Sequence, residues 1–203
     1  MNDPLILYTN PRSRGAIAVW MLNEVGVPYE TRVVEYGAEM KAAEFRALNP
    51  MGKVPVLVRG ATVVTECAAI CAWLADTYPE AELAPSPGER AAYYRWMFFA
   101  AGPLEAAVTN QTLGVTVDAK QQGFVGYGEG LGLVLDTLET ALAANPWIAG
   151  RRFSAADVYV GAHLGWGMMF GTIDRRPVFA DYWARLSERP ANVIAHAMEG
   201  EGQ

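Results

Sequence analysis

The amino-acid sequence predicts an α+β protein in two parts, a mixed four-stranded sheet with covering helices followed by an all-helical bundle. Short apolar runs alternate with helical patterns over the first ~80 residues, and strand signals then fade. Between these regions, Ala84-Pro-Ser-Pro-Gly88 places two prolines and a glycine in five residues, which is typical of a linker. We therefore expect a first domain at 1–82, a linker at 83–88 and a helical domain at 89–203.

The first domain begins with a strand–helix–strand unit. Leu5-Ile-Leu-Tyr8 is a short apolar run that ends at the turn Thr9-Asn-Pro11, a pattern that favours a buried strand. Residues 14–25 then carry apolar side chains at near-helical spacing, up to Gly26. A second extended segment covers 27–34. Two strands joined by a helix in this way should be parallel, with a right-handed connection.

The second half of this domain predicts a hairpin and a covering helix. A short helix is expected over 41–48, where Asn49-Pro50 ends it. Two short strands follow at 54–58 and 61–64, with a hairpin turn between them. A helix over 66–78 places its apolar side chains on one face. The sheet is therefore expected to mix parallel and antiparallel pairs.

The remaining chain is predicted to be helical. One long helix is expected from residue 89 to about 113, another from about 118 to 144, a third over 154–170, and one or two more after residue 177. Ser154 and Asp157 have the spacing of a capping box, with Asp in place of the usual Glu or Gln. This spacing predicts a folding role for Ser154 and not a nucleophilic one.

Composition narrows the classes of partner. Hydrophobic residues make up 52% of the chain and charged residues 19%, which is typical of a folded protein with a large core. The net charge of −6 disfavours nucleic acid and anionic membranes, since both attract clustered Lys and Arg. No apolar run reaches the ~18–20 residues of a membrane span. Residues 1–8 lack the basic and apolar regions of a secretory signal.

The only two cysteines are Cys67 and Cys71. Their spacing on a helix seldom permits a disulfide, so we expect reduced thiols and a cytoplasmic location. Without His or acidic residues at ligand spacing, they do not make a zinc site, and no metal or cofactor is expected.

Four positions could be structural or could contact a ligand. Val54-Pro55 could be an ordinary strand start or a cis peptide that presents the Val54 backbone. Glu66 could simply favour a helix N-terminus, or it could receive an ammonium while the free amides there receive a carboxylate. Ser13 could be a helix cap or a hydroxyl directed at a ligand. Tyr8 could be a core aromatic or a phenol pointing into the same space.

Taken together, these segments resemble the glutathione S-transferase superfamily over nearly the whole chain. The segments that carry the resemblance are Leu7-Tyr8 with Ser13-Arg14, Asn49-Pro-Met-Gly-Lys-Val-Pro-Val-Leu57, Thr65-Glu-Cys-Ala-Ala-Ile70 with Tyr78-Pro79, and Phe153-Ser-Ala-Ala-Asp157. The resemblance implies a thioredoxin-like first domain and a homodimer.

The resemblance also implies a glutathione site. It implies that Val54-Pro55 is cis and that the Val54 backbone pairs with the cysteinyl part of glutathione, as an added strand would. Glu66 and Cys67 would hold the γ-glutamyl end, and Lys53 would approach the glycyl carboxylate. The family usually has Ser where this chain has Cys67, so the hydroxyl is missing and the backbone amide remains.

The residue that activates the glutathione thiol is either Ser13 or Tyr8. Aligned with tyrosine-using classes of the family, the phenol falls at Tyr8, and aligned with serine-using classes, the hydroxyl falls at Ser13. We favour Ser13 because a helix N-terminus adds donors near the sulfur. Arg14 could add positive potential. Cysteine-using classes would need Cys in place of Ser13 or Arg14, and this chain has none there, so disulfide-exchange chemistry is not expected.

The resulting prediction is a transferase that uses glutathione as a co-substrate. The thiolate would attack a small apolar electrophile held by the helical domain, where Tyr94, Trp96 and Trp166 are candidate lining residues and also candidate core aromatics. The alternative is a non-catalytic member of the fold that acts as a binding or scaffold protein.

Overall fold

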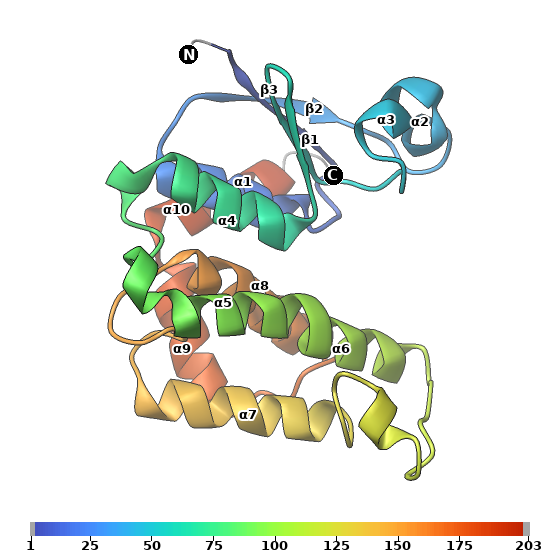
Figure 1. Ribbon diagram of the computed structural model, residues 1–203, viewed down its shortest axis with the longest axis vertical. Coiled ribbons are helices and arrows are strands. Elements are labelled where there is room, and N and C mark those ends of the chain that lie inside the picture. The colour runs from blue at the N-terminus through green and yellow to red at the C-terminus, as the bar shows by residue number, and fades with distance from the viewer. Residues whose placement is uncertain (1–2, 201–203) are drawn as a thin grey trace. The chain divides into compact units, whose positions relative to one another are not determined.

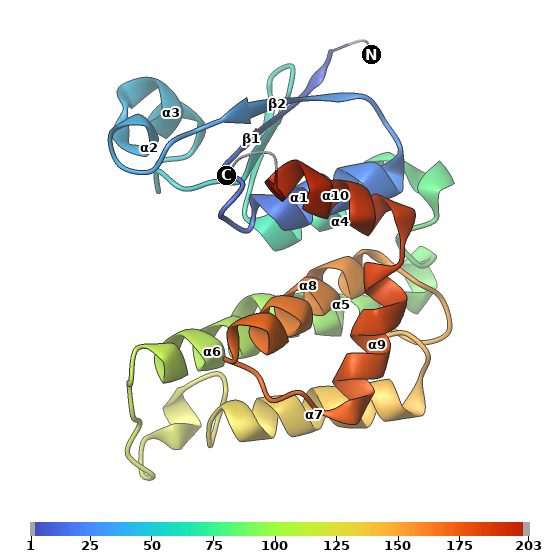
Figure 2. The ribbon, with the colours of Figure 1, turned by 180° about the vertical axis from the view of Figure 1, so that it is seen from behind.

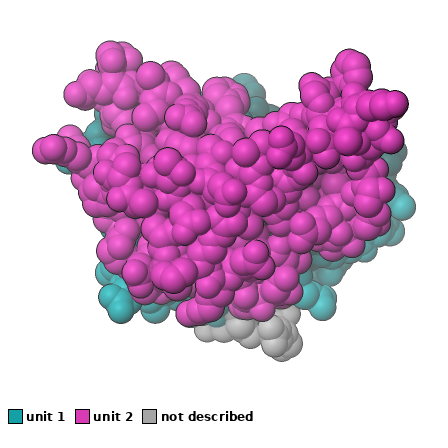
Figure 3. Space-filling model, turned by 90° about the horizontal axis from the view of Figure 1, so that it is seen from below, with its two compact units in different colours: residues 1–83, 188–203 teal, residues 84–187 magenta. Residues whose placement is uncertain are grey.

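The structure, a computed structural model, describes residues 3–200 and divides into two compact units. The first unit contains the chain up to Leu83 together with the segment from Glu188 onward, and the second contains 84–187 (Figure 3). The division expected from the sequence, at 1–82, 83–88 and 89–203, therefore differs at its C-terminal end. The last helix belongs with the sheet unit and not with the helical unit.

The first unit is built on a mixed four-stranded sheet of order β2-β1-β3-β4 (Figure 1). Its strands are β1 (Leu5–Thr9), β2 (Tyr29–Val33), β3 (Val56–Arg59) and β4 (Thr62–Thr65). β1 and β2 are parallel, and β3 pairs antiparallel with both β1 and β4. The predicted mixed sheet is confirmed. The strand–helix–strand unit supplies the parallel pair β1 and β2, the hairpin supplies the antiparallel pair β3 and β4, and β1 pairs with β3 to join the two.

The two faces of the sheet bury different parts of the chain. α1 (Gly15–Val25) and α4 (Cys67–Thr77) cover one face of the sheet (Figure 1). Leu7 of β1 is fully buried. Alternation along β1 places the side chain of Tyr8 on the opposite face. There, α2 (Ala38–Lys41) and α3 (Ala43–Leu48) contribute to a small core cluster. That cluster consists of Val34, Met40, Phe45 and Val56.

The C-terminal helix α10 (Pro190–Gly200) packs against α1 (Figure 2). Arg189, just before it, donates to both carboxylate oxygens of Glu24 at 2.6 and 2.7 Å, and the indole of Trp20 donates to the same carboxylate at 2.8 Å. Glu24 is 7% exposed in its side chain. A carboxylate so far from water needs such partners, so these bonds fix the last helix in the first unit.

The second unit opens with the long helix expected over 89 to about 113. α5 (Arg90–Phe99) continues through a π-helical turn (Ala100–Leu104) into α6 (Glu105–Thr112). Pro103 lies within the turn. Proline has no backbone N–H and cannot complete the α-helical bond, which accounts for a change of helical pitch at this point.

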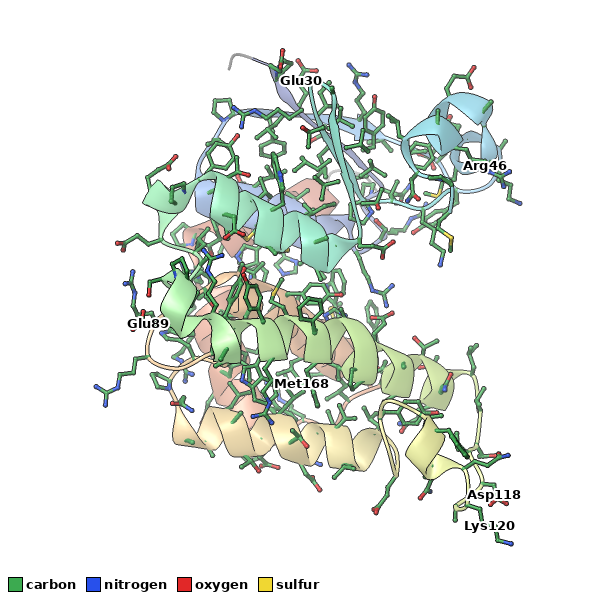
Figure 4. The ribbon with its side chains drawn as sticks, in the orientation of Figure 1. Glu30, Arg46, Glu89, Asp118, Lys120 and Met168 are labelled. Carbon is green, nitrogen blue, oxygen red and sulfur yellow. The ribbon has the colours of Figure 1, made fainter. Side chains whose placement is uncertain are left out.

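The helix expected from about 118 to 144 begins later. α7 covers Leu131–Ala144, and the chain before it forms a loop with one short 3₁₀ turn at Gln122–Phe124. Figure 4 labels Asp118 and Lys120 in this loop. Gly128 and Gly130 have φ values of 59° and 128°, which a right-handed helix does not allow. The prediction of the helix start was wrong because these glycines interrupt it.

The central helix of the second unit, α8 (Ala155–Phe170), begins with the predicted capping box. The backbone N–H of Ser154 donates to one oxygen of Asp157 at 2.9 Å. The other oxygen accepts from the Ile148 N–H and from the Tyr182 hydroxyl of α9 (Pro177–Ser187), each at 2.8 Å. Burial raises the pKa of Asp157 to about 6 against the opposing effect of these bonds. The folding role of Ser154 is confirmed.

Over residues 3–200, no helix combines the length and apolar character that a membrane crossing requires. Among residues 3–197, whose side chains the structure describes, no group of three or more His, Cys, Asp or Glu is arranged to hold a metal ion.

Candidate functional site

Three loops of the first unit meet at one edge of the sheet. Tyr8 lies opposite Val56 on the neighbouring strand, and Val56 lies opposite Thr65 on the next. The loop that follows β1, the loop that precedes β3 and the turn that follows β4 therefore emerge together. These segments contain Ser13 and Arg14, Lys53 to Pro55, and Glu66 and Cys67. The structure thus brings most of the predicted site residues to a single edge.

The loop after β1 is organised by the buried side chain of Asn10. Its amide nitrogen donates to the Val34 carbonyl at 3.1 Å, and its side-chain oxygen accepts from the Arg12 N–H at 3.1 Å. An asparagine that bonds the backbone two residues later makes a compact turn, here with Pro11 in between. The Asn10 side chain therefore ties the start of the α1 loop to the end of β2.

Ser13 lies in this turn with its hydroxyl engaged on both sides. The hydroxyl donates to the Asn10 carbonyl at 2.7 Å and accepts from the Gly15 N–H, the first amide of α1, at 3.0 Å. The N-cap of α1 is Arg14 and no side chain caps the helix, so Ser13 is not the cap considered for it, although its hydroxyl bonds the first helical amide from one position earlier. The Ser13 residue is half-buried.

The loop before β3 contains a second turn organised by an asparagine side chain, that of Asn49. Its side-chain oxygen accepts from the Met51 N–H at 3.1 Å, with Pro50 in between, and its amide donates to the Lys53 carbonyl at 2.7 Å. The next peptide bond, Val54–Pro55, is cis, as the family resemblance implied. Among the described residues, no hydrogen bond is formed by the N–H or the carbonyl of Val54. Its backbone is thus available to an extended ligand.

The turn after β4 presents the start of α4. Glu66 has φ 65° and ψ 120°, a conformation that non-glycine residues rarely adopt, and its side chain is exposed. Such a conformation costs about 1–3 kcal/mol and is found mostly at ligand-binding positions. No side chain caps α4, so its first amides face outward as donors for an anion.

Cys67, the first residue of α4, links this turn to the start of α1. Its thiol donates to the Arg14 carbonyl at 3.4 Å, and the residue is 6% exposed. Cys71, one turn later, is fully buried. Its pKa is raised well above the usual value, first by a hydrogen bond with Cys67 and then by burial. Cys71 therefore stays a neutral thiol.

Tyr8 lies on the other face of the sheet from the Ser13 turn. Its hydroxyl accepts from Arg32 at 2.9 Å, and its ring packs at a tilt against Phe45 with 6.1 Å between centroids. Tyr8 and Val54 both pack against the same core cluster. The Tyr8 side chain therefore combines a ring packed against the core cluster with a hydroxyl paired to Arg32.

The charges at this edge are favourable for an anionic ligand. Arg12, Arg14 and Lys53 are exposed there, in a protein whose net charge is −6. Arg46 of α3, labelled in Figure 4, belongs to the same unit. Glu66 is the acidic exception, and it stands beside the free amides of α4. A ligand with two carboxylates and one ammonium would match this arrangement.

Sequence analysis missed Asn10, Asn49 and Thr9. The two asparagines each precede a proline, and this Asn-Pro signal was interpreted only as a turn or a helix stop. Thr9 is 3% exposed, and its hydroxyl has no hydrogen-bond partner among the described residues. No sequence signal distinguishes it from an ordinary strand residue.

The candidate lining residues of the second unit do not form one surface. Trp96 is 4% exposed and packs edge-on against Phe99, whereas Tyr94 is 44% exposed and accepts a hydrogen bond from Arg90 at 3.3 Å. Positions two apart on a helix point to different sides, so the two side chains diverge on α5. Trp166 lies on α8 and is half-buried.

Comparison with known proteins supports the family resemblance found in the sequence. Residues 16–77 match the family described as "Glutathione S-transferase, N-terminal domain", and residues 128–190 match "Glutathione S-transferase, C-terminal domain". The chain is 31% identical over 205 residues to glutathione S-transferase 3 of Zea mays, covering 93% of this chain and 91% of that protein. The chain belongs to the glutathione S-transferase superfamily.

Other members of the superfamily are similar in fold or in part. A sphingomonad glutathione S-transferase solved in complex with glutathione superposes with a TM-score of 0.79 at 28% identity, over 96% of this chain and 98% of that one. A probable maleylacetoacetate isomerase of Vibrio cholerae is 40% identical over 88 residues, 41% of each chain. The superfamily fold therefore accounts for both units of the structure.

Proposed function

We propose that this protein binds glutathione at the edge of the sheet formed by Ser13, Val54 and Glu66, and ionises its thiol for attack on a small apolar electrophile. The observation that carries the proposal is the unpaired Val54 backbone beside the uncapped start of α4. An extended peptide can pair with the first while its terminal carboxylate is held by the second.

Each part of glutathione has a partner in the proposal. The cysteinyl backbone pairs with Val54 as an added strand. The γ-glutamyl carboxylate binds the first amides of α4, including that of Cys67, and Glu66 receives the γ-glutamyl ammonium. Lys53 approaches the glycyl carboxylate. Glutathione is a co-substrate here, and the proposal needs no other cofactor.

Ser13 is the proposed activator. A free thiol has a pKa of ~8.5, so only a minor fraction is thiolate at neutral pH. Turning the Ser13 hydrogen from the Asn10 carbonyl to the sulfur stabilises the thiolate, and the start of α1 adds positive potential. Arg14 contributes in the same direction. Each unit by which the thiol pKa falls corresponds to about 1.4 kcal/mol.

Tyr8 is the competing activator. Because its oxygen accepts from Arg32, its hydrogen stays available for a sulfur atom. Substituting Ser13 by Ala and Tyr8 by Phe separates the two: the activator is the residue whose loss abolishes thiolate formation.

The second substrate would be held by the helical unit, with Trp166 and Tyr94 as the proposed contacts and the buried Trp96 as a core residue of α5. Conjugation is the first reaction to test. Isomerisation is the second, because the chain is similar to a probable maleylacetoacetate isomerase over 41% of its length. Both reactions use the same thiolate.

The decisive experiment is retention on immobilised glutathione followed by a conjugation assay with a chlorodinitrobenzene and an isomerisation assay with a maleyl keto acid. Retention with turnover of either substrate supports the enzyme. Retention without turnover of any electrophile favours a binding or scaffold protein of the same fold. Absence of retention contradicts the proposal.

A homodimer and a cytoplasmic location complete the proposal. The free thiols Cys67 and Cys71 support a reducing compartment. The homodimer rests on similarity to the superfamily, and light scattering of the purified protein tests it.

A further inference from the structure

The hydroxyl of Thr9 is buried without a partner at the start of α1. Thr9 is the last residue of β1 and is 3% exposed. Its Oγ1 has no hydrogen-bond partner among the described residues, although a buried hydroxyl normally finds one. Leaving such a group unpaired costs free energy, so its presence calls for a function.

Gly15 shows what this hydroxyl faces. A Cβ built on Gly15 would collide with Oγ1 of Thr9 and would lie 3.0 Å from Oγ of Ser13. The two hydroxyl oxygens therefore lie on the same side of the first residue of α1, and they form no hydrogen bond with each other in the structure. Only glycine leaves room for them there.

The Ser13 oxygen has capacity for one more donor. A hydroxyl has one hydrogen and two lone pairs. In the structure the hydrogen goes to the Asn10 carbonyl, and one lone pair accepts from the Gly15 N–H. Among the described residues, nothing donates to the second lone pair, and the hydroxyl of Thr9 is without an acceptor.

We propose that Thr9 is a positioning residue for Ser13, donating its hydrogen to the Ser13 oxygen when the Ser13 hydrogen turns to the bound thiolate. This inference rests on the proposed function and on Ser13 as the activator. Hydrogen bonds in a chain polarise one another, so a Ser13 hydroxyl that accepts from Thr9 is a stronger donor to sulfur. The S–H bond of glutathione breaks, its electron pair stays on the sulfur and its proton leaves to solvent, and no other covalent bond changes.

The test compares Thr9→Val, which keeps the shape and removes the hydroxyl, with Thr9→Ser, which restores it. The readout is the ultraviolet absorbance of the bound thiolate as a function of pH, together with kcat and KM for glutathione. Thr9→Val is expected to raise the pKa of the bound thiol and to lower kcat below that pKa by about 2- to 10-fold, the range for one hydrogen bond. KM for glutathione is expected to stay unchanged, and Thr9→Ser to resemble wild type.

Stability separates this role from a structural one. Because Thr9→Val removes an unpaired buried hydroxyl, it is expected to unfold at the same or a higher temperature while it loses activity. In a Ser13→Ala background, Thr9→Val is expected to have no further effect on the bound thiol. Thr9→Ala serves as the second hydroxyl-free variant if the valine does not fold.

An unchanged pKa of the bound thiol in both hydroxyl-free variants overturns the inference and leaves the proposed function standing. An equal loss of activity with and without the Ser13 hydroxyl also overturns it. If wild type binds no glutathione, the proposed function itself fails, and the inference fails with it.

Discussion

The side-chain amide of Asn49 donates to the Lys53 carbonyl at 2.7 Å and so closes the loop that leads into the cis Val54–Pro55 peptide. Met51 N–H completes the loop by donating to the Asn49 oxygen at 3.1 Å. The proposed glutathione-binding backbone of Val54 is therefore held in place by a residue that need not touch the ligand.

Replacing Asn49 by Ala is expected to weaken glutathione binding by about 5- to 20-fold, since two hydrogen bonds that order the loop are lost. Isothermal titration measures the affinity. Asn49→Asp is the matched control, because it keeps the oxygen that accepts from Met51 and loses the donor to Lys53. It should fall between wild type and the alanine variant. Equal affinity in all three would contradict this role of the loop.

Substituting Glu66 is expected to weaken glutathione binding without lowering the free energy of unfolding. Glu66→Gly relieves a left-handed backbone conformation worth about 1–3 kcal/mol, partly offset by the greater freedom of glycine in the unfolded chain. We expect a free energy of unfolding equal to or above that of wild type, with a KM for glutathione at least about 10-fold higher because the ammonium partner is lost.

Glu66→Gln is the companion variant, because it removes the charge and keeps the length. A KM that rises in the glycine variant but not in the glutamine variant would show that Glu66 acts through shape and not through charge. Chemical unfolding and steady-state kinetics provide the two readouts.

Cys67 is expected to limit the affinity for glutathione. Its thiol is a weak donor to the Arg14 carbonyl at 3.4 Å, whereas a serine hydroxyl is a stronger donor and acceptor. Cys67→Ser should tighten binding by about 2- to 10-fold, the worth of one hydrogen bond. Cys71→Ala, one turn away and fully buried, is the control and should leave the affinity unchanged. Weaker binding by the serine variant would contradict the proposed γ-glutamyl contact.

The buried carboxyl group of Asp157 is expected to make the free energy of unfolding depend on pH. Its pKa is raised from 3.8 to about 6 in the folded protein. A carboxyl whose pKa is raised by folding contributes most below its unfolded pKa, and the contribution is lost as the pH rises through 6. The shift of roughly two units corresponds to about 3 kcal/mol.

The comparison of wild type with Asp157→Asn isolates this contribution, because the other carboxyl groups are common to both proteins. The difference in free energy of unfolding, wild type minus variant, should fall by about 2–3 kcal/mol between pH 4 and pH 7. Chemical denaturation at several pH values measures it. A difference that rises with pH would show that the carboxylate is stabilised, and not destabilised, by its burial.

The sheet and most helices were predictable because their signals are local. The alternation of strands and helices through residue 65, and the apolar spacing of α8, depend on neighbours within a few positions. The start of α7 was not predictable in this way. A helix was expected from about residue 118, and the positive φ values of Gly128 and Gly130 rule out a continuous helix across them.

The placement of α10 lay beyond local patterns. The carboxylate of Glu24 and the guanidinium of Arg189 are 165 positions apart, and neither has a sequence signature that names the other. An amphipathic last helix fits a bundle as well as it fits a sheet unit. Only the folded chain shows that it packs on α1.

The site could be predicted only in part, because its residues have local signals but contacts between distant segments bring them together. Glu66 and Cys67 stand out as the start of a helix, and Val54-Pro55 as the start of a strand, but their shared edge follows from strand register. The roles of Asn10 and Asn49 depend on the carbonyl groups that they meet, at Val34 and Lys53. The lack of a hydrogen-bond partner for the Thr9 hydroxyl, and its closeness to Gly15, follow from the folded structure and not from the sequence.

The central claim is that the edge formed by Ser13, Val54 and Glu66 binds glutathione and ionises its thiol. The most direct measurement is the ultraviolet difference spectrum of the protein with glutathione across pH, for wild type, Ser13→Ala and Tyr8→Phe. We predict thiolate absorbance at neutral pH in wild type and Tyr8→Phe, and its loss in Ser13→Ala with binding retained. Absence of thiolate from wild type at neutral pH, or its full retention in Ser13→Ala, would contradict the account.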